Sequence, residues 1–296
     1  MKNIREIFND PDTVCYSLEC PSLYIESDVI ASLDGKYILF HKAHEPTPLY
    51  ILIEKCKSVD FSDIAVLADA FSYHHDLPTF IRSYVKQEGY LFKPLVGDWN
   101  GDKLLDERIY YSNLIESYQS ILNIKINGDI LFKWYKCYDE NTNIELSSIC
   151  AKAGKEVQLY SMALKQIDPL TEYLCYYRIF ESLSQNNGKS WIADNIDKIS
   201  SYDFGNLEIK YYACDYKFET EYYFKLCKER ALKRIKDINE DRTLVADYLY
   251  HTVRCGIAHG KDANVITYDF NDNLKNVAED IYIVKLLARI GIEEKI

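Results

Sequence analysis

The prolines divide this chain of 296 residues into two parts of different character. The first part contains Pro78 and Pro94 among others, and a long helix cannot cross these positions because proline lacks a backbone N–H and its ring clashes with the preceding turn. In the second part the only proline is Pro169, and apolar residues recur at helical spacing. We therefore expect one domain over residues 1–150 and a second domain over residues 151–296.

The first part is predicted to be mixed, with a preference for strands. An apolar run over residues 49–53 has the length of a buried strand. Asp34 and Gly35 lie between two short apolar stretches, which predicts a hairpin. Shorter helices fit between the prolines, for instance over residues 61–71. The predicted fold class is thus α+β, with a β-leaning N-terminal domain followed by an all-α helical bundle.

The second part is predicted to contain four amphipathic helices. Asp168, just before a proline, marks the start of the first helix, and Asp241 is placed to cap the third. Gly256 weakens the third helix and Gly260 suits the position after a helix end, so that helix should close near His259. Short or medium connections between such helices predict a bundle. The expected spans are roughly 169–183, 209–238, 242–259 and 277–290.

The net charge of −11 argues against a general nucleic-acid binder, because phosphate contacts need basic surface. The acidity is concentrated in residues 1–150, which hold 14 basic against 23 acidic residues, whereas residues 151–296 hold 21 against 23. Any RNA contact should therefore lie in the second part. The candidates come from a basic cluster on the second expected helix, although such a run is also typical of a solvated helix face. They are Lys228, Arg230, Lys233 and Arg234.

The cysteines and the N-terminus indicate a reducing compartment. The chain has nine cysteines but no CxxC pair, and its histidines are not spaced as zinc ligands. No apolar run is long enough to span a membrane, and the first residues do not resemble a signal peptide. We expect a cytoplasmic protein with no metal, no cofactor and no membrane contact.

The segment from Arg254 to His259 is the strongest candidate for a site. Residues five positions apart are about 140° apart on an ideal helix, so the two side chains do not share one face. Either the helix is distorted at Gly256, or another element or a second subunit completes the pair. Histidine transfers protons near neutral pH, and the planar fork of arginine binds phosphoryl oxygens. RNA supplies its own nucleophile, the 2′-hydroxyl, so the pair suits RNA cleavage without a metal.

The sequence His251-Thr-Val-Arg254-Cys-Gly-Ile-Ala-His259-Gly260 resembles the Arg-x4-His motif of the HEPN superfamily. The helix with Asp168-Pro-Leu and Tyr-Arg-Ile-Phe-Glu181-Ser-Leu looks like the first long helix of a HEPN subgroup described as MauJ-like or defence-associated. The resemblance covers about half of the chain, from roughly residue 150 to the end. It implies a helical bundle that often forms a homodimer with a composite active site.

The resemblance also implies a metal-independent endoribonuclease that acts as a toxin, an abortive-infection effector or another phage-defence protein. Arg254 would bind the phosphate and His259 would transfer protons or contact the phosphate, while Glu181 would orient the arginine. The N-terminal domain would then bind a regulatory protein partner, sense a trigger or restrain the nuclease. One departure is Cys255, because the family has a polar residue there and a thiol is a weak hydrogen-bond donor.

Two alternatives to a catalytic HEPN nuclease follow from these observations. The departure at Cys255 and the acidic surface favour a non-catalytic HEPN module that binds or assembles other proteins. A third class is a partner of a nucleotidyltransferase. His251 lies four residues after Asp247 and would be either a second catalytic histidine or half of a surface ion pair, the second being the commoner case.

Overall fold

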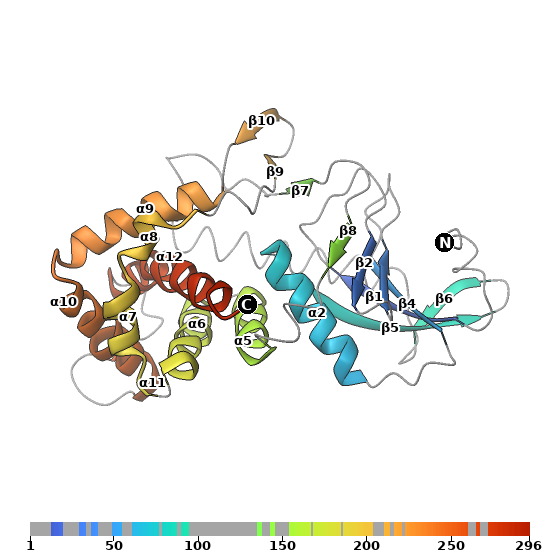
Figure 1. The fold of residues 1–296 in the computed structure, drawn as a ribbon, viewed down its shortest axis with the longest axis horizontal. Helices are drawn as coiled ribbons and strands as arrows, with labels where there is room; N and C mark the ends of the chain where they lie inside the picture. Colours follow the sequence, from blue (N-terminus) through green and yellow to red (C-terminus); the bar gives the residue numbers. More distant parts are fainter. Residues whose placement is uncertain are drawn as a thin grey trace. The chain divides into compact units, whose positions relative to one another are not determined.

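The computed structural model describes the following residues: 13–19, 30–33, 37–40, 49–54, 61–76, 79–87, 90–94, 135–137, 143–145, 154–166, 168–184, 186–203, 210–213, 216–220, 223–259, 265–266 and 272–296. They fall into two compact units (Figure 1). The first contains the described residues up to Gly154 together with those of Tyr212–Phe218. The second contains those of Lys155–Tyr211 and Glu219–Ile296.

The backbone of the first unit traces a seven-stranded sheet in the order β6-β5-β1-β4-β3-β2-β8. Neighbouring strands are antiparallel except for the parallel pair β2 and β8. The strands are β1 Thr13–Glu19, β2 Ile30–Leu33, β3 Tyr37–Phe40, β4 Leu49–Glu54, β5 Phe80–Gln87, β6 Tyr90–Pro94 and β8 Asn143–Glu145. A small sheet has the order β10-β9-β7, with β7 Tyr135–Cys137, β9 Lys210–Ala213 and β10 Tyr216–Thr220.

Two local predictions for this unit are confirmed. The expected strand over residues 49–53 is β4. The hairpin predicted at Asp34–Gly35 is the pairing of β2 with β3, in which Leu33 lies opposite Tyr37. The two turn residues themselves lie outside the described part of the chain.

The helix α2, Phe61–His75, contains most of the buried side chains that the structure describes in the first unit. Leu67, Ala70 and Phe71 are fully buried at helical spacing. Where the helix has ended, the backbone N–H of Thr79 donates to Ser72 Oγ at 3.0 Å. The helix extends one turn beyond the expected span of 61–71, through residues 72–75.

The predicted fold class, α+β with a β-leaning N-terminal domain, is wrong for the residues whose side chains the structure describes. Those residues are helical apart from turns and short connections, and none of them lies in a strand. The strands named above are described by their backbone course alone. The β-leaning prediction rested on short apolar runs and a turn signal, which are local, whereas the side chains described in this unit belong mainly to the 15-residue helix α2.

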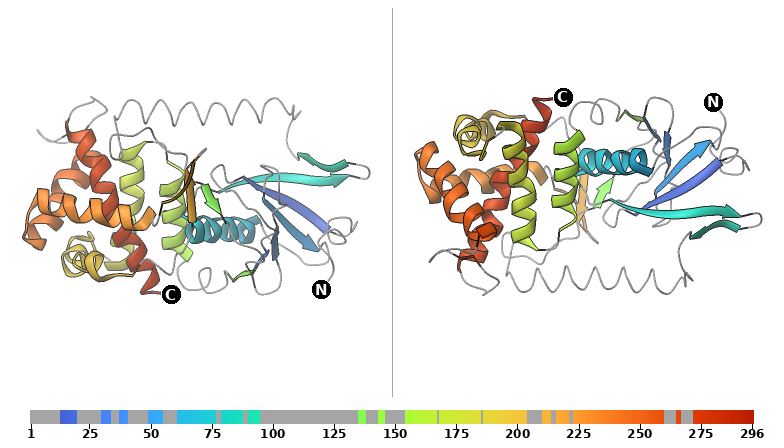
Figure 2. Two further views of the ribbon diagram at one scale, coloured as in Figure 1. Left: turned by 90° about the horizontal axis from the view of Figure 1, so that it is seen from above. Right: turned by 90° about the horizontal axis from the view of Figure 1, so that it is seen from below.

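The second unit is helical where its side chains are described. The longest helix, α12, packs against α6 and α9 and carries much of the unit's core (Figure 2). The helices are α5 Gly154–Leu164, α6 Pro169–Ser184, α7 Lys189–Asn195, α8 Lys198–Ser201, α9 Tyr223–Ile238, α10 Arg242–Asp247, the π-helix η2 Tyr248–Arg254, α11 Cys255–His259 and α12 Asp272–Glu293.

Three of the four predicted helices lie where expected, although α12 is longer than predicted. The second was expected over residues 209–238, but α9 begins only at Tyr223. The preceding segments, Lys210–Ala213 and Tyr216–Thr220, are strands. They are rich in tyrosine and phenylalanine, which favour extended backbone over helix.

Close packing of α12 on its neighbours depends on Gly291. A methyl group there would lie 2.5 Å from Leu183 Cδ1 and 2.9 Å from the ring of Trp191. The ring of Trp191 also stacks on Phe180, with centroids 5.2 Å apart. The missing side chain therefore lets α12 approach both α6 and α7.

A buried polar network joins three elements behind the site. Arg234 Nε donates to Asp280 Oδ1 at 2.7 Å, and Arg234 Nη2 donates to the Tyr248 hydroxyl at 2.9 Å. That hydroxyl donates in turn to Asp280 Oδ2 at 3.0 Å. Burial raises the pKa of Asp280 to about 6, although the bonds from Arg234 and Tyr248 oppose the rise. The network ties α9 and α12 to the first residue of η2.

Candidate functional site

Helix α6 forms one wall of the site. Asp168 caps it as predicted, since its carboxylate accepts the backbone N–H groups of Leu170 and Thr171, both at 3.0 Å. Further along, the buried Tyr173 donates its hydroxyl to the carbonyl of Leu249 at 2.8 Å. Leu249 belongs to η2, so this bond fixes the π-helix against α6.

The opposite wall comes from one irregular helix. It starts at α10, where Asp241 Oδ1 accepts the backbone N–H of Thr243 at 2.8 Å, as the sequence predicts. It then widens into η2 and tightens again into α11. At the junction the N–H of Cys255 donates to the carbonyl of Tyr250, five residues back instead of four. Such π turns hold one extra residue, and they recur at functional sites.

Arg254, the last residue of η2, connects the two walls. Its Nε and Nη2 donate to the same carboxylate oxygen of Glu181, at 3.0 and 2.8 Å. Its guanidinium also lies 5.9 Å from the centre of the Tyr250 ring. Burial disfavours the charge of Arg254, but the Glu181 carboxylate outweighs this effect and raises the pKa of the arginine above its usual value. Arg254 is therefore a fixed cation, as a phosphate-binding role requires.

Arg254 and His259 are in direct contact. Nη1 of the arginine lies 2.8 Å from Nε2 of the imidazole. Arginine has no acceptor atom, so a hydrogen bond between these two atoms requires Nε2 to accept. On an ideal helix the two residues would be about 140° apart. The π-helix η2 ends at Arg254, and Cys255–His259 form the α-helix α11, so the helix is not distorted at Gly256.

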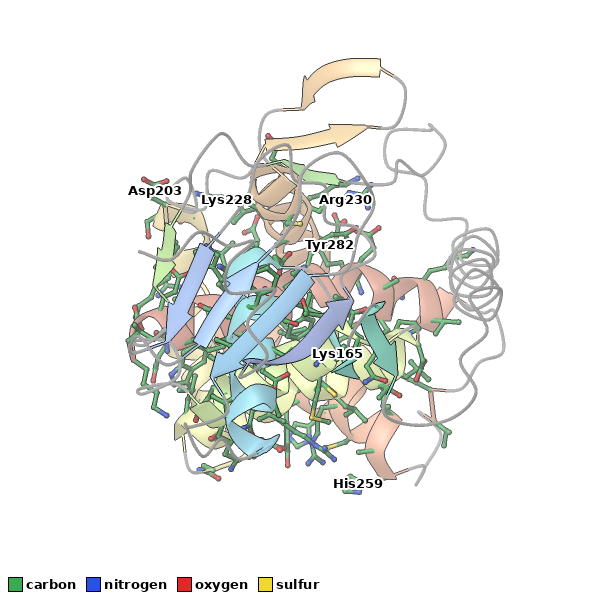
Figure 3. The ribbon with its side chains drawn as sticks, turned by 90° about the vertical axis from the view of Figure 1, so that its right-hand side faces the viewer. Lys165, Asp203, Lys228, Arg230, His259 and Tyr282 are labelled. Atoms are coloured by element: carbon green, nitrogen blue, oxygen red, sulfur yellow. The ribbon has the colours of Figure 1, made fainter. Side chains whose placement is uncertain are left out.

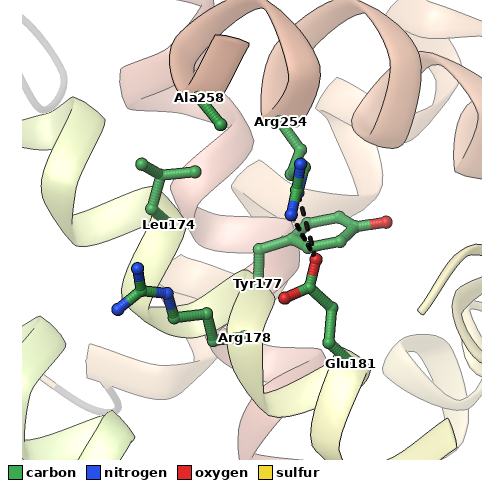
Figure 4. Close-up of a pocket in the computed structure, with 6 residues that line it drawn as sticks. All are labelled: Leu174, Tyr177, Arg178, Glu181, Arg254 and Ala258. Carbon is green, nitrogen blue, oxygen red and sulfur yellow. Dashed lines mark hydrogen bonds and ion pairs between the residues drawn. The ribbon is translucent and has the colours of Figure 1, made fainter. Parts of the chain in front are cut away.

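A small hollow lies beside the Arg254–Glu181 pair (Figure 4). Its volume of about 50 Å³ has room for the equivalent of a few water molecules, far below the several hundred Å³ typical of pockets for metabolites. It therefore has room for only one small group of a larger ligand. The residues that line it are Leu174, Tyr177, Arg178, Glu181, Arg254 and Ala258.

Among the predicted site residues, Glu181, Arg254 and His259 are brought together. Cys255 lies next to them, half-buried with a free thiol, and its interaction with Arg254 contributes to the raised pKa of the arginine. His251 points elsewhere: its Nε2 lies 3.7 Å from Asp247 Oδ1, and its side chain is 59% exposed. That geometry is the surface pair that the sequence favoured over a second catalytic histidine.

The predicted RNA-binding cluster on α9 is mostly engaged within the protein. Arg230 pairs with Glu279 at 3.4 Å, and the Lys228 ammonium donates to the carbonyl of Tyr202 at 3.1 Å. Arg234 belongs to the buried network with Asp280. Lys233 is exposed. Figure 3 shows Lys228 and Arg230 far from His259 within the helical unit.

Sequence reasoning assigned no role to two residues of the site, Arg178 and Tyr250. Arg178 is exposed and lines the hollow, whereas Tyr250 lies under the Arg254 guanidinium. A single arginine or tyrosine on an amphipathic helix carries no distinguishing pattern, so no sequence signal marked either one.

No group of three or more His, Cys, Asp or Glu side chains among the described residues is arranged to hold a metal ion. None of the helices described combines the length and the apolar character that crossing a membrane requires.

Comparison with known proteins links the helical unit to one family. Residues 157–293 match the family model described as "Methylamine utilization protein MauJ". This span contains Glu181, Arg254 and His259, so the site lies wholly within the MauJ-like region. No curated protein and no solved structure is significantly similar to this chain.

Proposed function

We propose that this protein is an endoribonuclease of the HEPN superfamily, which cleaves RNA through the RNA's own 2′-hydroxyl without a metal or another cofactor. The observation that carries the proposal is the 2.8 Å contact between Arg254 and His259. It places a permanent cation and a proton-transfer group at one point of the MauJ-like region. Phosphodiester cleavage by an internal hydroxyl needs these two groups.

The contacts of Arg254 support a sequence of steps. An arginine has five N–H donors, so the bonds to Glu181 and His259 do not exhaust it. A phosphate that draws Nη1 away from His259 would release Nε2 of the imidazole. Nε2 would then accept the proton of the 2′-hydroxyl, whose oxygen attacks the phosphorus while Arg254 neutralises the developing negative charge.

The second proton transfer favours a homodimer. The leaving 5′-oxygen must receive a proton, and one imidazole cannot be proton acceptor and proton donor in the same step. His259 is exposed at the end of α11, where a second copy of the chain could bring its own imidazole to the same phosphate. We therefore propose a composite site with two copies of the Arg254–His259 pair.

The proposed setting is the cytoplasm, where the enzyme would act as a toxin, an abortive-infection effector or another phage-defence protein. The free thiols of Cys175, Cys227 and Cys255 are compatible with such a compartment. The N-terminal unit would bind a regulatory partner or restrain the nuclease. These roles rest on the HEPN resemblance.

The test is RNA cleavage in EDTA by the full chain and by the variants Arg254→Ala and His259→Ala. Each variant should lose at least about 100-fold in rate, the usual contribution of positioned acid–base and charge-stabilising groups. Wild-type products should end in a 2′,3′-cyclic phosphate, which shows that the 2′-oxygen was the nucleophile.

The matched control is Arg242→Ala. Arg242 is 62% exposed and pairs with Asp197 on the surface of the same unit, so its loss removes a cation without touching the site. Cleavage by this variant should equal that of the wild type. Equal cleavage by all four proteins, or products with 3′-hydroxyl ends, would show that the assignment is wrong.

A second candidate is a non-catalytic binding module. Glu181 occupies two N–H donors of Arg254, and Cys255 stands where the family has a polar residue. The variant Cys255→Asn distinguishes the nuclease from the binding module. A latent nuclease would gain activity with a stronger hydrogen-bonding side chain at this position, and a binding module would not.

A further inference from the structure

We propose that Arg178 binds a phosphate of the RNA strand next to the one that is cleaved. The hollow between Arg178 and Arg254 would hold this neighbouring phosphodiester. The inference rests on the proposed function, since it names how the same site would hold its substrate. It also assigns a role to a residue outside the Arg-x4-His motif.

Arg178 differs from the other arginines whose side chains the structure describes. Each of the others has a carboxylate partner within the chain. These arginines are Arg230, Arg234, Arg242, Arg254 and Arg289. Arg178 is exposed and forms no hydrogen bond or ion pair with any described residue. Its guanidinium fork is therefore available to a ligand, and forked recognition of phosphate oxygens is the chemistry that arginine performs best.

The charges that line the hollow add up to an excess of one positive charge. Arg178 and Arg254 are cations, Glu181 is the single carboxylate, and the remaining lining side chains are uncharged. A phosphodiester carries one negative charge and would balance this excess. The chain as a whole has a net charge of −11, which repels RNA. The positive charge that lines the hollow would attract a phosphate locally.

The hollow is not where the reaction itself would occur. His259 is not among the residues that line it, although its neighbour Ala258 is. Figure 4 shows Arg178 turned away from the Arg254–Glu181 pair, on the other side of the hollow. Arg254 thus contacts His259 and also lines the hollow. A strand bound across Arg254 would present one phosphate to His259 and the next to Arg178.

The experiment measures binding separately from cleavage. The full chain is titrated with a fluorescein-labelled 12-nucleotide RNA carrying 2′-O-methyl groups throughout, which cannot be cleaved through the 2′-oxygen. Arg178→Gln should weaken binding about fivefold to tenfold. It should also lower the slope of log Kd against log salt concentration by about 0.7, the value for one phosphate contact on a single strand. Arg178→Lys should keep the slope and weaken binding less, because it retains the charge but loses the fork.

The matched control is Arg242→Gln, which removes an exposed arginine from the same unit and should leave Kd and slope within twofold of the wild type. Thermal unfolding of all variants checks that they are folded. Equal binding by the two glutamine variants would overturn the proposed phosphate site, and so would the absence of oligonucleotide binding by the wild type.

Cleavage kinetics then distinguish this proposal from the proposed function. With a natural 12-nucleotide RNA, Arg178→Gln should raise KM and leave kcat nearly unchanged, whereas a dinucleotide with a single phosphate should be cleaved equally by variant and wild type. An Arg178-dependent binding of the methylated RNA without any RNA cleavage would refute the nuclease and retain the phosphate site. A loss of kcat equal on both substrates would refute the role of Arg178 as a binder of the neighbouring phosphate.

Discussion

Two arginine–carboxylate pairs lie at the two ends of the same π-helix, and they differ in exposure more than in geometry. At its start, Tyr248 joins Arg234 and Asp280, whose closest atoms are 2.7 Å apart. At its end, Arg254 and Glu181 are 2.8 Å apart. The Asp280 side chain is fully buried, whereas the Glu181 side chain is 27% exposed.

This difference separates an anchoring role from a functional one. A buried ion pair gains its strength from exclusion of water, and loss of either partner leaves an uncompensated charge inside the protein. A half-exposed pair is screened by solvent and can exchange partners at little cost. The first pair therefore fixes where η2 begins, while the second leaves Arg254 able to take a phosphate in place of an internal partner.

The largest effect on the free energy of unfolding is expected from Arg234→Ala. The variant leaves Asp280 buried without its cation, so the free energy of unfolding should fall by about 3–5 kcal/mol. Denaturant unfolding followed by circular dichroism measures it. Arg242→Ala, which breaks an exposed pair, should cost less than about 1 kcal/mol. Similar losses in the two variants would show that burial does not separate these pairs.

The pH dependence of stability tests the same pair. Burial raises the pKa of Asp280 from its ordinary 3.8 to about 6, so between these values the folded protein binds a proton that the unfolded chain does not. The stabilising contribution of Asp280 is therefore full below about pH 4 and falls as the pH rises through 6. The stability difference between wild type and Asp280→Asn should grow by up to about 3 kcal/mol from pH 7 to pH 4.

Unfolding titrations of both proteins at several pH values measure this trend. Subtracting the free energy of unfolding of the variant from that of the wild type cancels the contributions of carboxylates that titrate the other way. One of these is Glu156, whose pKa is lowered by its bonds to Lys295 and Ser182 in spite of burial. A difference that shrinks toward acid would contradict the buried, proton-accepting state of Asp280.

A smaller effect should follow from Gly291→Ala. The added methyl group would press on Leu183 and Trp191 and force α12, which carries Asp280, away from α6, which carries Glu181. Overpacking of this kind costs about 1–3 kcal/mol. Gly154→Ala is the matched control, because a methyl group there meets nothing within 4 Å. Thermal unfolding should show a lower Tm for the first variant alone.

The smallest effect on stability is expected from Glu181→Gln, at about 1 kcal/mol or less because the pair is half-exposed. The same change removes the single carboxylate of the hollow, so binding of the 2′-O-methyl oligonucleotide should become about threefold tighter. Fluorescence anisotropy measures this. Weaker binding in the variant would mean that Glu181 acts by orienting Arg254 for the phosphate and not by competing with it.

The sequence predicted the features that depend on local chemistry. The aspartates at 168 and 241 cap their helices as expected, because N-caps act over two or three residues. The pairing of Glu181 with Arg254 followed only from the family resemblance, since 73 residues separate them. The contact between Arg254 and His259 did not follow from ideal helix geometry, which places them about 140° apart.

The remaining differences come from tertiary contacts. The basic run on α9 pointed to RNA, yet the partners of Arg230 and Arg234 lie on α12, some fifty residues later, where no local pattern foretells them. The sequence does not predict the π turn either, because its extra residue is stabilised by tertiary contacts such as the hydrogen bond from Tyr173 to Leu249. Arg178 could be identified as a site residue only from the hollow that it lines.

The π turn gives the chain one surplus residue between Asp247 and Cys255. Deletion of a single residue from this segment would allow an ordinary α-helix with four-residue bonds, a more regular arrangement. The same deletion would remove the π turn, and with it the local widening of the helix that ends at Arg254. The number of residues in this segment would thus distinguish a copy of this protein that keeps the π turn from one that has a regular α-helix there.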